Sequence, residues 1–161
     1  VLAFEPDPYR FKALKENVEI NAWKNVKVFQ LAVSNKEEER KMESGESFVI
    51  KSQKHVVTVK TVRLDTFLQT LQVDPDIIKI DVEGAELEVL MGMKDILEIG
   101  NAKIICEVHP NLLESLGYKQ KELEDFLKLY GYNIYLVNRE GELVLSSIRM
   151  DKRRHYLFQR V

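Results

Sequence analysis

The stretch Asp76-Ile-Ile-Lys-Ile-Asp-Val-Glu-Gly-Ala-Glu86 decides how the rest of the chain is interpreted. Its three isoleucines, Ile77, Ile78 and Ile80, form a β-branched run that is typical of a strand covered on both faces. Gly84 marks a turn after that strand, and the apolar residues that follow predict a helix packed back on the sheet. The stretch therefore predicts a strand, an acidic turn and a helix, the elements from which α/β sheets are built.

Acidic residues gather at the carboxyl end of this predicted strand. Asp81, Glu83 and Glu86 lie close together in the sequence, and like charges at short range repel one another. In open α/β sheets, the carboxyl ends of the strands form the edge that binds ligands. We therefore expect these carboxylates to serve a site. The alternative is that Asp81 and Glu83 only cap the following helix, and the two roles are compatible.

The composition is that of an ordinary globular chain. Its 161 residues, 45% hydrophobic and 31% charged, suffice for a single domain over residues 1–161. The formal net charge of -2 gives no basic field, so we expect no nucleic-acid partner. The single cysteine, Cys106, excludes an internal disulfide and fits a reducing, cytoplasmic setting. No apolar run reaches the roughly 20 residues that cross a bilayer, so we expect no membrane partner.

The segments on either side of the central stretch extend the α/β pattern. Before it, the sequence predicts a strand (1–4), a helix from an N-cap at Asp7 to about residue 21, and a strand (26–33). A charged turn (34–41) and a β-hairpin insertion (47–50 with 55–62) follow, then a short helix (64–71) capped by Asp65 or Thr66. After it, we predict strands at 102–108, 132–137 and 156–158, and an amphipathic helix at 119–130.

Three further residues are candidates for chemistry. Glu5 ends the first predicted strand, where a carboxylate can accept hydrogen bonds from both hydroxyls of a ribose; the alternative is an exposed charge at a strand end. Glu107 and His109 lie on one side of their strand, and a glutamate there is costly unless it is paired or faces a pocket. Histidine in general can exchange a proton near neutral pH, so His109 suits a general base, whereas a lone histidine is more often a structural hydrogen-bonding group. We interpret His55 and His155 as structural or surface residues.

A metal site is the competing use of the acidic edge. Oxygen ligands and one imidazole, from Asp81, Glu83, Glu107 and His109, could hold Mg²⁺ or Mn²⁺. Nothing in the spacing requires this, so we predict no bound metal.

Several motifs occur together in the first 110 residues. The most specific are Asp81-Val-Glu-Gly-Ala-Glu86 and Glu107-Val-His-Pro110, and they are preceded by Phe4-Glu-Pro-Asp-Pro8, Asn25-Val-Lys-Val28, Leu31-Ala-Val-Ser34 and Val62-Arg-Leu-Asp-Thr-Phe67. On these residues the chain resembles an FkbM-type methyltransferase, a branch of the enzymes that depend on S-adenosylmethionine. The resemblance implies a Rossmann-like sheet, mostly parallel with an antiparallel last strand, and methylation of a hydroxyl on a sugar or other small-molecule acceptor.

The resemblance also assigns roles to residues. The ribose of S-adenosylmethionine would lie at Glu5 and Pro6, its adenine beside the turn of Leu31 and Ala32, and its methionine portion by Asp81. The acceptor side would be lined by Glu83, Glu107 and His109. Ala32 stands where many related methyltransferases have an acidic residue that reads the adenine amino group, so backbone contacts would have to serve there.

The chain departs from such enzymes at its start. They carry a first strand and a glycine-rich loop before the segment that opens this chain, and the seven glycines here form no Gly-x-Gly cluster. Either the natural protein extends upstream of Val1, which we expect, or the chain is a remnant with a rearranged sheet. A strand edge left exposed in this way could pair between chains and form a homodimer.

Two other functions fit part of the pattern. A domain of this fold without catalysis could act by binding another protein, and S-adenosylmethionine would then not bind. A nicotinamide-dependent oxidoreductase could use Glu5 on its own ribose, but the segments 81–86 and 107–110 argue against it.

Overall fold

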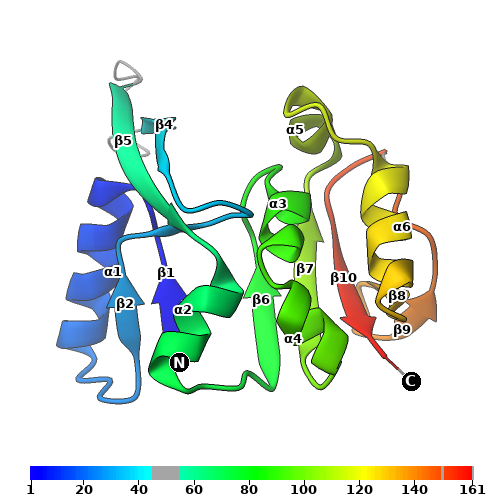
Figure 1. The fold of residues 1–161 in the computed structure, drawn as a ribbon, viewed down its shortest axis with the longest axis horizontal. Helices are drawn as coiled ribbons and strands as arrows, with labels where there is room; N and C mark the ends of the chain where they lie inside the picture. The colour runs from blue at the N-terminus through cyan, green and yellow to red at the C-terminus, as the bar shows by residue number, and fades with distance from the viewer. Residues whose placement is uncertain (45–54, 150, 161) are drawn as a thin grey trace. The chain divides into compact units, whose positions relative to one another are not determined.

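The computed structural model describes residues 1–44, 55–149 and 151–160. The chain falls into two compact units, residues 1–63 and 64–161. Each unit combines helices and strands, so the predicted α/β class is confirmed (Figure 1). The single domain over residues 1–161 remains a prediction.

The first unit begins with the predicted strand, helix and strand. Strands β1 (Leu2–Phe4) and β2 (Lys27–Phe29) pair in parallel, and helix α1 (Pro8–Ile20) connects them. The Asp7 carboxylate accepts the backbone amides of Tyr9 and Arg10 at 2.8 and 3.1 Å, so it is the N-cap that the sequence predicts.

The remaining strands of the first unit differ from the expectation. The predicted strand at 26–33 is two strands in different sheets, because β3 (Ala32–Val33) pairs with β5 (His55–Val62) and not with β1. Strand β4 (Glu39–Ser44) pairs antiparallel with β5, so the predicted turn at 34–41 is wrong from Glu39 onward. Most β4 side chains are charged or polar and alternate residues are exposed, which hides the strand in the sequence. The predicted hairpin partner, 47–50, lies outside the described residues.

The second unit contains a five-stranded sheet in the order β6-β7-β10-β8-β9. Strands β6 (Ile77–Ile80) and β7 (Lys103–Val108) are parallel, and β10 (Arg154–Gln159) runs antiparallel to both β7 and β8 (Asn133–Val137). The predicted antiparallel last strand is therefore confirmed. The sheet is mixed and not mostly parallel as predicted, because β6 and β7 form the one parallel pair among its described pairings. The sheet also has β9 (Leu143–Leu145), an antiparallel edge strand that was not predicted; it is only three residues long, and its apolar side chains are all exposed.

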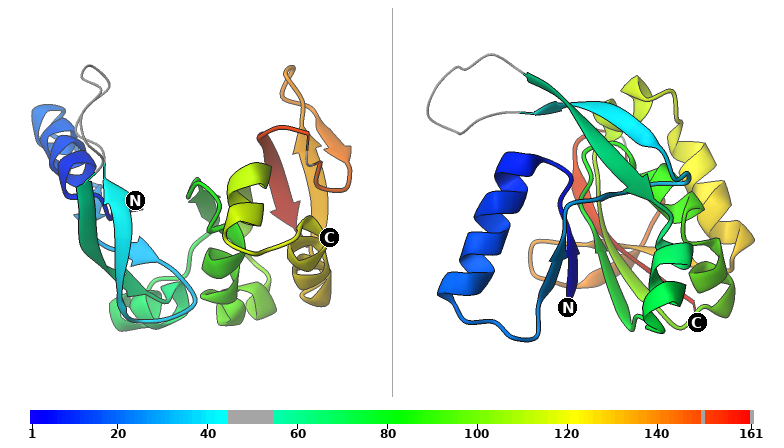
Figure 2. Two further views of the ribbon diagram at one scale, coloured as in Figure 1. Left: turned by 90° about the horizontal axis from the view of Figure 1, so that it is seen from above. Right: turned by 60° about the vertical axis from the view of Figure 1, so that its left-hand side comes forward.

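Helices α3 (Glu86–Met91), α4 (Lys94–Ile99) and α6 (Gln120–Leu129) cover one face of this sheet (Figures 1 and 2). The core between them is made of fully buried side chains such as Ile104, Cys106, Tyr156, Phe158, Leu87, Leu90, Leu123 and Leu127. The opposite face is more open, since Ile77 is 64% exposed and Ile105 36%. The expectation that the isoleucine run is covered on both faces is therefore wrong, because an apolar run alone does not distinguish one covered face from two.

The other two helices described in the second unit are α2 (Leu64–Leu71) and α5 (Pro110–Ser115). Asp65 lies within the first turn of α2, and its carboxylate accepts the amides of Asp95 and Ile96, each at 3.2 Å. Asp65 thus accepts hydrogen bonds from free backbone amides at the start of α4, whereas the sequence suggested that it caps its own helix.

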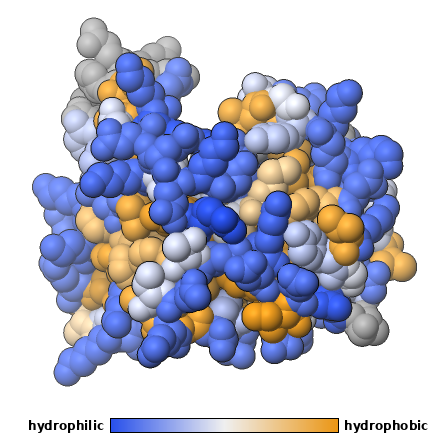
Figure 3. Space-filling view, in the orientation of Figure 1, coloured by the Kyte–Doolittle hydropathy of each residue, from blue (hydrophilic) through white to orange (hydrophobic). Residues whose placement is uncertain are grey.

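No helix in the described parts of the chain has the length and apolar character needed to span a membrane. Hydrophilic side chains cover most of the face seen in Figure 3, and hydrophobic ones are scattered between them.

The only cysteine gives a direct test of the core. Cys106 has no exposed surface, and burial, followed by the neighbouring Glu86 carboxylate, raises the pKa of its thiol well above the usual value. We expect a chromogenic thiol reagent to find no reactive group in the native protein and one group in denaturant. Rapid reaction of the native protein would contradict the packing of β7.

Candidate functional site

The carboxyl ends of β6 and β7 bring the predicted acidic residues together. The two strands are parallel and Ile80 pairs with Cys106, so Asp81 leaves β6 at the edge where β7 ends with Glu107 and Val108. His109 follows immediately and is the residue before α5. As the sequence predicts, Asp81, Glu107 and His109 lie at one edge of the sheet.

The buried side chain of Glu86 links the segments that form this edge. It is fully buried, and its Oε1 accepts three hydrogen bonds: from the amide of Gly84 at 3.1 Å, from the amide of His109 at 3.1 Å, and at His109 Nδ1 at 3.0 Å. One carboxylate oxygen therefore joins the turn after β6 to the end of β7. The second oxygen, Oε2, is buried and has no hydrogen-bond partner within the described residues.

The contact with Glu86 fixes which nitrogen of His109 faces the site. A carboxylate at Nδ1 holds the proton of the neutral imidazole on that nitrogen, which leaves Nε2 as the unprotonated atom. Nε2 lies 4.0 Å from Asp81 Oδ1 and 3.8 Å from Glu107 Oε1, too far for a hydrogen bond to either. His109 thus presents a proton-accepting nitrogen to the space between two carboxylates.

Glu107 is paired, as a glutamate on a buried strand must be. Its exposed fraction is 8%, and its carboxylate contacts His155 Nε2 at 3.2 Å and Arg153 Nε at 3.4 Å. Arg153 immediately precedes β10, and His155 lies in β10 where the antiparallel register sets it opposite Glu107. His155 is therefore part of this edge and not only the structural or surface residue expected from the sequence, and Arg153 was not predicted there. The predicted antiparallel last strand is the signal that could have placed them there.

Asp81 and Glu83 are the exposed acids of the edge. A hydrogen bond from Lys79 Nζ, 2.9 Å from Asp81 Oδ2, holds the pKa of Asp81 below its usual value despite partial burial. Glu83 has a left-handed backbone, with φ of 48°, and its side chain makes no ion pair or hydrogen bond within the described residues. Neither side chain caps α3, whose N-cap residue is Ala85, so the capping alternative is wrong.

Gly84 makes the turn between these elements possible. Its φ is +107°, and a Cβ at this position would come within 2.7 Å of the backbone carbonyl carbon of Leu112 in α5. Only glycine accommodates both the backbone angle and this close approach.

The other predicted cofactor residues belong to the first unit, residues 1–63. Glu5 follows β1, and its Oε1 accepts the amide of Asp7 at 2.8 Å. Pro6 is half-buried beside it, and Leu31 and Ala32 lie where the chain leaves β2 and enters β3. Their contact with a cofactor remains a prediction.

Three side chains of the edge could hold a cation. Ligand atoms of Asp81, Glu107 and His109 all lie within 4.8 Å of one another, and Glu86 would orient the imidazole from behind. Glu83, which the sequence included in this alternative, is not part of the group. The absence of a bound metal remains our expectation.

The role of Glu86 can be measured through stability. Glu86→Ala leaves three buried donors without an acceptor, and we expect it to lower the free energy of unfolding by about 3 kcal/mol in urea denaturation. Glu114→Ala, which removes an exposed carboxylate from α5, is the matched control and should change little. Equal losses in the two variants would show that the hydrogen bonds of Glu86 do not support the site.

Comparison with known proteins identifies the family. The family model of the methyltransferase FkbM domain matches residues 1–134. The hexuronic acid methyltransferase AglP of Haloferax volcanii is 34% identical over 160 residues, which cover 94% of this chain and 63% of that protein. The crystal structure of the methyltransferase FkbM from Methylobacillus flagellatus KT has a similar fold, with a TM-score of 0.59 at 17% identity over 99% of this chain and 36% of that one. The chain belongs to the FkbM methyltransferase domain family, as its motifs predict.

Proposed function

We propose that the complete protein is an S-adenosylmethionine-dependent methyltransferase that methylates a hydroxyl group of a sugar or another small molecule. Membership of the FkbM family supports the reaction class. The observation that carries the proposal is His109, whose Nδ1 contacts a buried carboxylate while Nε2 faces the acidic edge.

In this proposal His109 is the general base. An alcohol is a poor nucleophile until its proton leaves, and His109 Nε2 would accept that hydroxyl proton. Glu86 stabilises the imidazolium that forms, because its carboxylate already contacts Nδ1. Glu107 and Glu83 would line the side of the site that binds the methyl acceptor. There Glu107 can accept a hydrogen bond from a second hydroxyl of that molecule and so orient the reacting hydroxyl.

The residues that would hold the cofactor have suitable chemistry. When bound, S-adenosylmethionine supplies a methyl group on a positively charged sulfonium, and the departing group is a neutral thioether. The lowered pKa of Asp81, caused first by its hydrogen bond from Lys79, keeps an anion at the end of β6 that can face such a cation. Glu5 and Pro6 would hold the ribose, and the backbone at Leu31 and Ala32 would lie beside the adenine.

The relatives suggest which acceptor to try first. The Haloferax volcanii protein is named for methylation of a hexuronic acid, so an acid sugar is the first candidate for this chain. Folded protein that binds neither S-adenosylmethionine nor its demethylated product would instead favour the protein-binding function.

The base assignment predicts a specific kinetic change. In the complete protein, His109→Ala should lower turnover by about 100-fold, because the hydroxyl would lose its proton acceptor. The dissociation constant for S-adenosylmethionine, measured by calorimetry on the same variant, should stay the same. Unchanged turnover would remove His109 from this role.

The ribose assignment predicts the opposite pattern. Glu5→Ala should weaken binding of S-adenosylmethionine by about tenfold or more, the effect of losing hydrogen bonds to a charged acceptor. Glu37→Ala, which removes an exposed glutamate of the same unit, should leave the affinity unchanged. An intact affinity in Glu5→Ala would exclude Glu5 from the cofactor site.

A further inference from the structure

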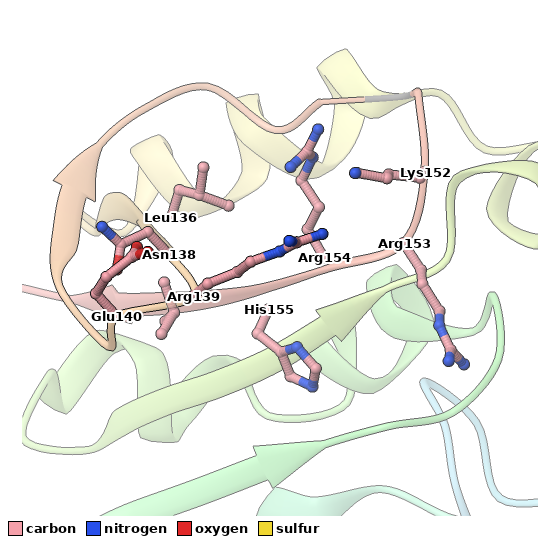
Figure 4. Close-up of a pocket in the computed structure, with 9 residues that line it drawn as sticks. Leu136, Asn138, Arg139, Glu140, Lys152, Arg153, Arg154 and His155 are labelled. Carbon is pink, nitrogen blue, oxygen red and sulfur yellow. The ribbon is translucent and has the colours of Figure 1, made fainter.

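A second feature of the 64–161 unit is a pocket with strongly positive walls. Its volume is about 660 Å³, within the range of small-molecule sites. It lies between the turn after β8 and the segment that enters β10, and Figure 4 shows side chains entering it from both. Its lining is Leu136, Val137, Asn138, Arg139, Glu140, Lys152, Arg153, Arg154 and His155.

Positive charge exceeds negative charge in this lining. Arg154 is already paired, since its guanidinium contacts Asp151 at 2.6 Å. Arg139 and Lys152 are exposed and make no ion pair or hydrogen bond with any residue that the structure describes. Glu140 is the one acid of the lining. Two cations from opposite walls are thus available to a ligand, and a group of negative charge suits them.

The pocket adjoins the candidate active site. Arg153 and His155 line it, and both side chains contact the Glu107 carboxylate, at 3.4 and 3.2 Å. Glu107 in turn lies 3.8 Å from His109 Nε2. A ligand whose anionic group occupies the pocket can therefore extend its uncharged part past Glu107 toward the proposed base.

We propose that this pocket binds the anionic group of the methyl acceptor, a carboxylate or a phosphate on a sugar-sized molecule, through Arg139 and Lys152. The identity of the ligand as the methyl acceptor rests on the proposed function, but the binding of an anion in this pocket does not. Its physical basis is the unpaired positive charge and the size of the pocket, and it requires no contribution from residues 1–63. The half-buried Leu136 and Val137 offer an apolar surface on which a sugar ring can lie.

The test compares sugars that differ in charge. Calorimetric titration of the full chain at low salt uses glucuronate, glucose 6-phosphate and neutral methyl glucoside as probes. We expect at least one anionic sugar to bind about tenfold or more tightly than the neutral one, the gain of one good charged hydrogen bond. The preference should shrink at high salt because the interaction is electrostatic. The anion that binds distinguishes a carboxylate from a phosphate.

Matched variants separate the pocket from overall charge. Arg139→Gln with Lys152→Gln should abolish the preference for the anionic sugar. Lys94→Gln with Lys103→Gln removes two exposed charges elsewhere in the same unit and should preserve it. Equal affinity for charged and neutral sugars, or equal loss in both double variants, would overturn the proposal.

The same titrations distinguish this inference from the proposed function. Protein that binds S-adenosylmethionine but shows no charge preference refutes the pocket alone. Protein that prefers an anionic sugar through Arg139 and Lys152, but binds no S-adenosylmethionine, refutes the methyltransferase assignment and supports the anion site.

Discussion

One buried carboxylate holds the acidic edge of the second unit together. Glu86 Oε1 accepts hydrogen bonds from the turn after β6 and from His109, which follows β7, so two segments far apart in the sequence share a single acceptor. A buried carboxylate is costly unless it accepts hydrogen bonds, and the three that Oε1 accepts come from groups that define the site, whereas Oε2 has no partner among the described residues. The position of His109 is therefore coupled to the fold and not only to its own rotamer.

The two sides of Glu107 have opposite electrostatic character. Toward β6 it faces His109 and, beyond it, Asp81, so that side is acidic with one imidazole. Toward β10 it contacts Arg153 and His155, which begin the positively lined pocket. Glu107 thus forms the boundary between a region that attracts a cation, such as a sulfonium, and one that attracts an anion. In the proposed function, such a boundary would orient an acceptor with one negative group, with that group toward β10.

Much of this edge could be predicted from local sequence, because it depends on short-range rules. The isoleucine run, Gly84 and the apolar run within 102–108 indicate neighbouring strands whose carboxyl ends meet, and this brings Asp81, Glu107 and His109 together. Features that depend on long-range packing were missed. The sequence could not show that Ile77 is exposed, that Asp65 serves α4, or that β2 and β3 enter different sheets. Each of these depends on which distant element packs nearby, and no local pattern reports that.

The residues of the pocket could not be linked to the candidate active site from local sequence either. Arg139 and Lys152 lie in polar segments that read as solvated turns, and nothing in their spacing links them to His109. The link is the antiparallel register of β10, which returns the chain to the end of β7 and carries a basic segment with it. A strand that reverses direction brings its first residues to the edge where the parallel strands end, so residues before such a strand are as well placed for ligand contact as those after a parallel one. Basic residues just before such a strand are therefore placed where they can contact an anionic ligand, as we propose for Lys152.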